Sequence, residues 1–187
     1  MLLTGLLPDI STDPAIETAT DSIEAGRSGT IVAPVGIRPP LLAAVASRAA
    51  TPLVVLTATG RDAESLTNAL ASWIPGVAML PAWETLPHER LSPQVDTMAR
   101  RIAVLRRLVH PIEGDESAGP LSVLVVPIRA FLQPIISGLA DLEPVRVRTG
   151  DILDLTDVTN RLAELGYERV DMVEGRGQMS VRGGILD

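Results

Sequence analysis

The segment best placed to bind a phosphate group follows a short apolar run at residues 30–33, which is typical of a buried strand. Nucleotide-binding proteins follow such a strand with a glycine-rich loop and a Gly-Lys-Ser/Thr helix start, whose N–H groups, lysine and hydroxyl hold the phosphates and magnesium. The residues at that place here are Val35, Gly36, Ile37, Arg38, Pro39 and Pro40. Because the two prolines lack N–H donors and the chain contains no lysine, we predict that this degenerate loop binds no nucleotide, although Arg38 could still contact an anion.

A second candidate for chemistry is the pair Glu84 and His88, whose i,i+4 spacing would place both side chains on one face of a helix. Pro81 and Pro87 argue against a helix there, so the spacing loses its meaning. His110 also lies beside a proline, and nothing in the sequence orients either histidine as a general base. The chain has no cysteine, which excludes disulfides and cysteine-based zinc sites. We therefore predict no catalytic residue and no metal site.

Four arginines share one expected helix over residues 92–108: Arg100, Arg101, Arg106 and Arg107. They could contact DNA or a protein partner. A solvated face is the favoured interpretation, because Asp96 and Arg100 have ion-pair spacing and the net charge of −7 repels nucleic acid. The apolar side of the same helix is expected to consist of Val95, Ile102, Leu105 and Leu108. Trp83, just before this helix, is expected to anchor its loop by packing.

Strand and helix signals alternate over the first 140 residues. Helices are expected over 14–25, 41–49, 59–73, 92–108 and 127–132, and strands over 30–33, 53–57, 77–80 and 121–126. This alternation predicts an α/β fold with a parallel sheet and helices on both faces.

The pattern changes near Asp141. Residues 145–148 alternate strictly, as an antiparallel strand does, a helix is expected over 154–165, and a hairpin is expected over 167–181 with its turn at 175–177. These signals predict the start of a small α+β domain, dividing the chain into residues 1–140 and 141–187. Because residues 185–187 read as the middle of a strand, we expect the chain to be a fragment with a truncated second domain.

The distribution of apolar residues gives an expectation for the cellular location of the protein. Hydrophobic residues make up 46% of the chain, yet no apolar run reaches the length of a membrane span and no basic residue precedes the short apolar start. We therefore expect a cytoplasmic protein without membrane contact.

Two motifs carry a resemblance to a known family. One is Trp83-Glu84-Thr85-Leu86-Pro87 with Ser92-Pro93-Gln94, Arg100-Arg101 and Leu105; the other runs from Gly166-Tyr167 through Val170, Glu174 and Gly177 to Val181-Arg182-Gly183-Gly184-Ile185-Leu186-Asp187. In order and spacing, residues from about 30 to the end resemble the N-terminal, UvrB-like region of the bacterial transcription-repair coupling factor (Mfd).

The resemblance implies a helicase-like first domain (P-loop NTPase-derived, RecA-like), corresponding to UvrB domain 1a without a functional phosphate loop. A smaller inserted domain 2, which binds UvrA, would follow. The full-length family protein is an ATP-dependent DNA translocase that removes stalled RNA polymerase from double-stranded DNA. Its motor domains use ATP and magnesium, which implies no cofactor and no catalysis in this chain. The role implied here is that of an adaptor recruiting UvrA for nucleotide excision repair.

Arg182 matches the family arginine that contacts UvrA, so the resemblance implies a partner-binding guanidinium. The alternative is a local ion pair with Glu174 or Asp187. Two other functions stay open for the chain as a whole. One is a nucleotide-binding UvrB or helicase fragment, against which the missing lysine speaks; the other is an autoinhibitory domain that packs its partner-binding surface against the C-terminal domain of the full-length protein.

Overall fold

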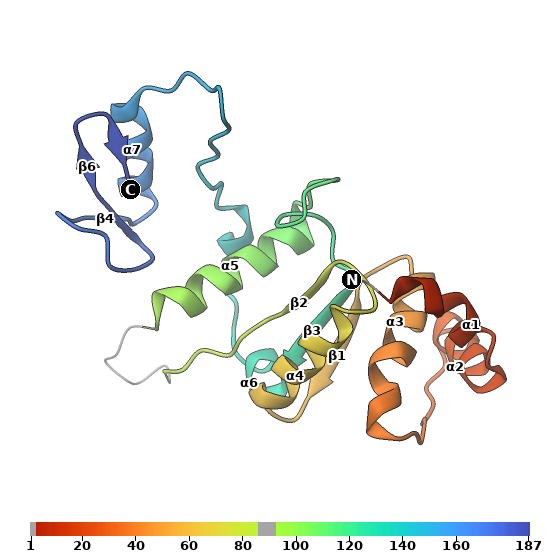
Figure 1. The fold of residues 1–187 in the computed structure, drawn as a ribbon. Helices are drawn as coiled ribbons and strands as arrows, with labels where there is room; N and C mark the ends of the chain where they lie inside the picture. Colours follow the sequence, from red (N-terminus) through yellow and green to blue (C-terminus); the bar gives the residue numbers. More distant parts are fainter. Residues whose placement is uncertain (1–2, 86–92) are drawn as a thin grey trace.

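The computed structural model describes residues 3–85 and 93–187 (Figure 1). The N-terminal part contains η1 (Thr4–Leu6), α1 (Leu7–Ser11), α2 (Pro14–Glu24), η2 (Val35–Ile37), α3 (Arg38–Arg48), β1 (Leu53–Thr57), α4 (Gly60–Leu70) and β2 (Val77–Met79). After the undescribed residues follow α5 (Val95–Val109), β3 (Val123–Pro127), α6 (Ile128–Phe131) and η3 (Leu139–Asp141). The chain continues through α7 (Leu155–Glu164), β4 (Glu168–Arg169), β5 (Gln178–Met179), β6 (Val181–Arg182) and β7 (Ile185–Leu186).

The first three strands form one parallel sheet in the order β1-β3-β2. Val123 of β3 is the register partner of both Leu53 and Val77. The chain crosses from β1 to β2 through α4 and returns to the middle position through α5. Connections between parallel strands are almost always right-handed. The connection through α4 and the connection through α5 run in opposite directions across the sheet, so the two helices are expected on opposite faces. The prediction of an α/β fold with a parallel sheet is confirmed.

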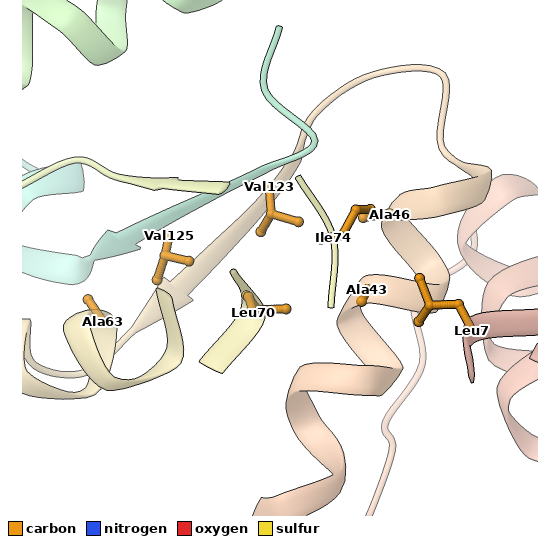
Figure 2. Close-up of a cluster of buried hydrophobic side chains, with 8 residues drawn as sticks. All are labelled: Leu7, Ala43, Ala46, Ala63, Leu70, Ile74, Val123 and Val125. Atoms are coloured by element: carbon orange, nitrogen blue, oxygen red, sulfur yellow. The ribbon is translucent and has the colours of Figure 1, made fainter. Parts of the chain in front are cut away.

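One face of the sheet carries the larger hydrophobic cluster (Figure 2). Val123 and Val125 point from β3 toward Ala63 and Leu70 of α4, and α1 and α3 extend the same cluster. Because the side chains of Ala43 and Ala46 are small, α3 can approach the other members of this cluster closely. Leu70, Val123 and Val125 have no exposed surface, so these positions contribute the full free energy of apolar burial.

The opposite face carries a smaller cluster. Leu124 and Val126 of β3 pack there against Val104 of α5 and Ala130 of α6. Helices therefore cover both faces of the sheet, as predicted. The cover is incomplete over the edge strand β1, where Val54 is 51% and Leu56 47% exposed.

Helix starts follow the local sequence closely. Asp13 accepts hydrogen bonds from the backbone N–H groups of Ala15 and Ile16 and caps α2, while Thr59 accepts from the N–H of Asp62 and caps α4. Both helices begin within one residue of the start predicted from the sequence.

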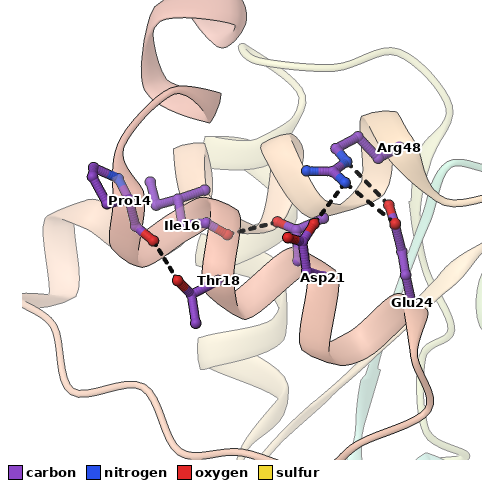
Figure 3. Close-up of polar contacts among 7 residues, drawn as sticks. Pro14, Ile16, Thr18, Asp21, Glu24 and Arg48 are labelled. Atoms are coloured by element: carbon purple, nitrogen blue, oxygen red, sulfur yellow. Dashed lines mark hydrogen bonds and ion pairs between the residues drawn. The ribbon is translucent and has the colours of Figure 1, made fainter.

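The last turn of α3 is joined to α2 by a single guanidinium (Figure 3). Arg48 lies 2.9 Å from Asp21 and 3.0 Å from Glu24, and the hydrogen bonds to these two carboxylates raise its pKa. These two ion pairs connect α2 to α3, which belongs to the helical layer that covers the sheet.

The expected strand at residues 30–33 is wrong. This segment is irregular, and Ile31 and Val32 are 50% and 95% exposed. The run lies between Gly29 and Pro34, which limits its length, and a strand forms only where a distant edge supplies the other half of its hydrogen bonds. Apolar content alone cannot provide that partner.

Two expectations for the C-terminal region are also wrong. Residues 145–148 are an irregular connection rather than an antiparallel strand. The expected hairpin over 167–181 is replaced by a parallel pairing of β4 with β5, and the antiparallel hairpin forms later, between β6 and β7 around Gly183. Gly183 has φ +61°, so the tight turn occurs where a residue without Cβ permits it. The strand expected at 185–187 is confirmed as β7.

Candidate functional site

The C-terminal unit, residues 155–187, begins with a well-defined helix. Asp154 accepts hydrogen bonds from the N–H groups of Thr156 and Asp157, and these bonds lower the pKa of its carboxyl group. Gly166, with φ +88°, ends α7 as predicted and turns the chain into β4. The helix thereby sets the start of the four short strands that carry the candidate site.

Arg182 lies on β6 and is exposed. Its Nε donates to the backbone carbonyl of Asp171 at 3.1 Å, and its Nη2 donates to the same oxygen. The hydroxyl of Ser180 also donates to this oxygen at 3.1 Å. No ion pair joins Arg182 to Glu174 or Asp187, so the local pairing considered from the sequence does not form. The guanidinium is oriented by a backbone carbonyl and has no carboxylate partner in the described part of the chain.

A hollow of ≈ 470 Å³ opens beside Arg182. It is lined by Arg169, Val170 and Asp171 from the β4 side and by Ser180, Val181 and Arg182 from the β5–β6 side. Arg169 and Arg182, 13 residues apart in the sequence, thus line one depression, which suits an acidic side chain of a partner. Sequence reasoning missed Arg169, because only the fold, with β4 paired to β5, brings it to the same hollow as Arg182.

The degenerate loop forms η2 and the first turn of α3. Here the N–H of Ile37 bonds to the carbonyl of Pro34 at 3.0 Å and that of Arg38 to the carbonyl of Val35. Pro39 and Pro40 follow in the first turn of α3 and have no N–H. Among the first four residues of this helix, two donors are absent and one is used internally, which leaves little of the backbone cradle that holds a phosphate.

The described part of the Trp83 loop is held by Arg101 of α5 and by Gln133, which follows α6. The guanidinium of Arg101 lies 4.5 Å from the ring centre of Trp83 and donates to the carbonyl of Pro81 at 2.6 Å. The side-chain amide of Gln133 accepts from the N–H of Trp83 at 2.8 Å and donates to its carbonyl. This arrangement matches the expected role of Trp83 as a packing anchor.

Glu84 is held in the same loop. Its carboxylate accepts a hydrogen bond from the hydroxyl of Thr97, and its carbonyl accepts one from Arg129 at 3.1 Å. Partial burial acts to raise the pKa of Glu84, but the hydrogen bonds from Thr97 and from the N–H groups of Glu84 and Gln94 together lower it. His88 lies outside the described residues, so the pair Glu84–His88 stays untested.

The expected solvated face of α5 is wrong for three of its four arginines. Arg100 is exposed and forms the predicted ion pair with Asp96 at 2.7 Å. Arg101 is 1% exposed, and burial lowers its pKa. Arg106 donates to the carbonyl of Leu142 at 3.0 Å, and Arg107 to that of Gly119 at 2.8 Å. Three of the guanidinium groups therefore organise the fold.

The apolar side of α5 is rotated from its expected position. Val95 and Leu108 are 47% and 39% exposed, whereas Val104 and Leu105 are buried together with Thr97 and Arg101. The buried stripe thus includes an arginine whose stacking on Trp83 replaces an apolar contact, which hydrophobic periodicity cannot reveal.

Residues 3–85 and 93–187 contain no group of three or more His, Asp or Glu side chains arranged to hold a metal ion. Within the same ranges, every helix is too short or too polar to cross a membrane.

Comparisons with known proteins identify the family of the chain. A family model described as "UvrB interaction domain" matches residues 145–187, the segment that contains the hollow. The chain is 48% identical over 159 residues to the transcription-repair-coupling factor of Mycobacterium tuberculosis, a match that covers 84% of the chain and 13% of the relative.

Two further relatives match the chain at lower identity. The Escherichia coli transcription-repair-coupling factor is 28% identical over 79% of the chain and 12% of its own length. The UvrABC system protein B of Vibrio vulnificus is 26% identical over 100% of the chain and 29% of its own length. The chain thus spans only about an eighth of the transcription-repair-coupling factors that it matches. It belongs to the transcription-repair-coupling factor family and corresponds to the UvrB-like region of that family.

Proposed function

We propose that the chain is a non-catalytic adaptor that recruits UvrA for nucleotide excision repair. The observation that carries the proposal is the position of the hollow: Arg169 and Arg182 border it within the segment that matches the UvrB interaction domain. A depression lined by two arginines suits a partner that presents carboxylates, and arginine is enriched among the residues that dominate interface energies. We propose Arg182 as the central partner-binding residue and Arg169 as its neighbour.

We infer that the sheet is an inherited helicase-like, RecA-like fold that has lost its nucleotide. The parallel strands, the helices on both faces and the similarity to UvrABC system protein B support this ancestry. The missing donors at Pro39 and Pro40 and the absence of lysine support the loss of ATP binding.

We further propose a domain boundary near residue 141, at the end of η3. The helix η3 still belongs to the sheet domain, because Arg106 binds the carbonyls of Ala140 and Leu142. His110 contacts Asp141 at 2.7 Å at the same point. Beyond Leu142 the chain runs without helix or strand to Asp154, where the C-terminal unit begins (Figure 1).

For a longer protein that contains this chain, we propose the activity of the transcription-repair-coupling factors. It would include ATP-driven translocation on double-stranded DNA with magnesium, removal of stalled RNA polymerase, a cytoplasmic location and an intramolecular contact with a C-terminal domain. None of these activities is assigned to residues of the present chain.

The test measures binding of the chain to UvrA by isothermal titration calorimetry. Arg182→Ala is expected to weaken binding by roughly 30-fold, because a central interface arginine contributes about 2 kcal/mol or more. Arg182→Lys should lose most of this affinity as well, since an ammonium group cannot pair with a carboxylate in bidentate fashion. Arg161→Ala is the matched control, because Arg161 lies in the same unit and, among the residues that the structure describes, pairs with Glu164 alone.

Unchanged UvrA affinity for Arg182→Ala would remove Arg182 from the site. A parallel titration with a fluorescent ATP analogue separates the adaptor from a nucleotide-binding helicase fragment. Saturable binding of the analogue that is lost in Arg38→Ala would overturn the adaptor interpretation.

A further inference from the structure

One side chain connects the C-terminal unit to the sheet domain. Arg176, in the turn before β5, places its Nε 3.0 Å from Oδ1 of Asp96 on the first turn of α5. The other carboxylate oxygen of Asp96 binds Arg100 at 2.7 Å. Asp96 therefore serves two guanidinium groups, one on its own helix and one on the distant unit.

A second contact lies directly beside this ion pair. Gly177 follows Arg176 and lies so near Val95 that a Cβ added to it would be 3.1 Å from Cγ1 of the valine. Gly177 has φ +82°, so the backbone turn at this point requires a residue without a side chain. The turn thus rests on the first two residues of α5 through one apolar contact and one charged contact.

The segment that connects the sheet domain to the C-terminal unit begins beside the C-terminal end of α5. Arg106 binds the carbonyl of Leu142, His110 contacts Asp141, and Arg146 lies 3.9 Å from Asp115. The chain therefore leaves the sheet domain at the C-terminal half of α5 and returns to its N-terminal turn (Figure 1). The extended connection from residue 143 to residue 153 joins these two anchored points without a helix or strand of its own.

We propose that the pair Asp96–Arg176 is an electrostatic latch that sets the orientation of the C-terminal unit on α5. With the latch closed, the hollow at Arg169 and Arg182 has one orientation relative to the sheet. With the latch open, the unit swings on the connection 143–153 while its own hydrogen bonds stay intact. The partners are exposed, with Arg176 68% and Asp96 41% accessible, so salt or a competing carboxylate can open the latch. The latch does not depend on the proposed binding of UvrA.

The experiment measures the distance between two spin labels by double electron–electron resonance. Because the chain has no cysteine, Ser65→Cys on α4 and Asn160→Cys on α7 provide exposed, unique attachment sites in the two parts. The unmodified latch at about 0.1 M salt is expected to give one narrow distance distribution. Raising the salt to about 1 M, where the screening length falls from about 10 Å to about 3 Å, is expected to broaden it.

The variants separate the latch from other effects. Arg176→Glu faces Asp96 with a like charge and is expected to abolish the narrow distribution, while Arg176→Lys should largely keep it. Arg161→Glu makes the same charge change within the unit without touching α5 and should leave the distribution unchanged. Arg100→Gln removes only the helical pair of Asp96 and should also leave it unchanged.

A narrow and unshifted distribution in Arg176→Glu would overturn the latch, as would a broad distribution for the unmodified chain at low salt. Because UvrA is absent from this measurement, its outcome is independent of the Arg182 binding test.

Discussion

The sheet domain and the C-terminal unit are stabilised in different ways. In the sheet domain, residues 123–126 of β3 are at most 5% exposed and pack between helices on both faces. In residues 155–187 only Met179 and Ser180 are buried, and α7 buries no residue. The scaffold thus rests on burial of apolar surface, whereas the unit that carries the candidate site rests on local hydrogen bonds and short strands.

This difference has a consequence for dynamics. Regions with few buried apolar contacts open at lower free energy than the core of the same protein. The unit that would meet a partner is therefore expected to open locally while the parallel sheet stays intact.

The largest effect is expected in the core of the sheet domain. Leu70→Ala removes a side chain with no exposed surface and should lower the free energy of unfolding by about 2–5 kcal/mol. The matched control in the C-terminal unit is Met172→Ala, where the side chain is 65% exposed and a change within about 0.5 kcal/mol is expected. Urea denaturation followed by circular dichroism measures both. Similar losses in the two variants would contradict the contrast between the regions.

Two glycines with positive φ test how tightly each region is packed. A Cβ at Gly76 would lie 2.9 Å from the carbonyl of Pro120 and the N–H nitrogen of Ser122, whereas a Cβ at Gly166 would meet open space. Gly166→Ala should cost about 1–2 kcal/mol for the left-handed backbone alone. Gly76→Ala should exceed this cost, since two strand-connecting segments must also move apart.

The same urea titrations, monitored by amide hydrogen exchange, assign each loss to its region. Gly76→Ala should lower protection across β2 and β3, and Gly166→Ala only across α7 and β4. Equal costs for the two substitutions would show that the end of α7 is packed as closely as the sheet.

Arg101 tests whether a buried cation can serve as part of a core. Arg101→Ala removes the stacking on Trp83 and the hydrogen bond to Pro81, but it also relieves a desolvated charge. A net loss of roughly 1–3 kcal/mol is expected. Arg100→Ala, one residue away and 59% exposed, should change stability by less than about 0.5 kcal/mol.

Fluorescence in a Trp73→Phe background reports on Trp83 alone. Its emission should shift to longer wavelength in Arg101→Ala, because the ring loses the group that covers it. An unshifted spectrum with unchanged stability would mean that Arg101 does not hold the loop.

The smallest effect concerns the cap of α7. The folded pKa of Asp154 lies below its ordinary value because the carboxylate accepts hydrogen bonds from Asp157 and Thr156. Because the pKa is lower in the folded state, the ionised carboxylate stabilises the helix at pH values above the unfolded pKa of about 3.9. This stabilisation is lost as the pH falls through the folded pKa. Hydrogen exchange of the first turn of α7 should therefore show less protection at the lowest pH than near neutrality.

Asp154→Asn is the control, because asparagine caps a helix without titrating in this range. The variant should keep protection of α7 near neutral pH and lose its acid dependence. Acid sensitivity that persists in the variant would assign the effect to another carboxylate.

Local rules predicted the elements whose signals lie within a few residues of one another. The caps at Asp13, Thr59 and Asp154, the strand at 53–57 and the helix stop at Gly166 all follow from short-range backbone hydrogen bonding. The family motifs, including the one that contains Arg182, could also be recognised from the sequence. The sequence by itself therefore determined the α/β class, most helix boundaries and the family.

Pairings between distant segments were decided only by the tertiary structure. The exposed run at 30–33 and the strand at 53–57 have similar apolar content, but only the second found an edge in β3. The parallel pairing of β4 with β5 brought Arg169 to the same hollow as Arg182, and the ring of Trp83 helped to cover Arg101. Each outcome depends on a partner supplied by a remote part of the chain, because the free energy of a buried charge or a strand edge is set by what covers it.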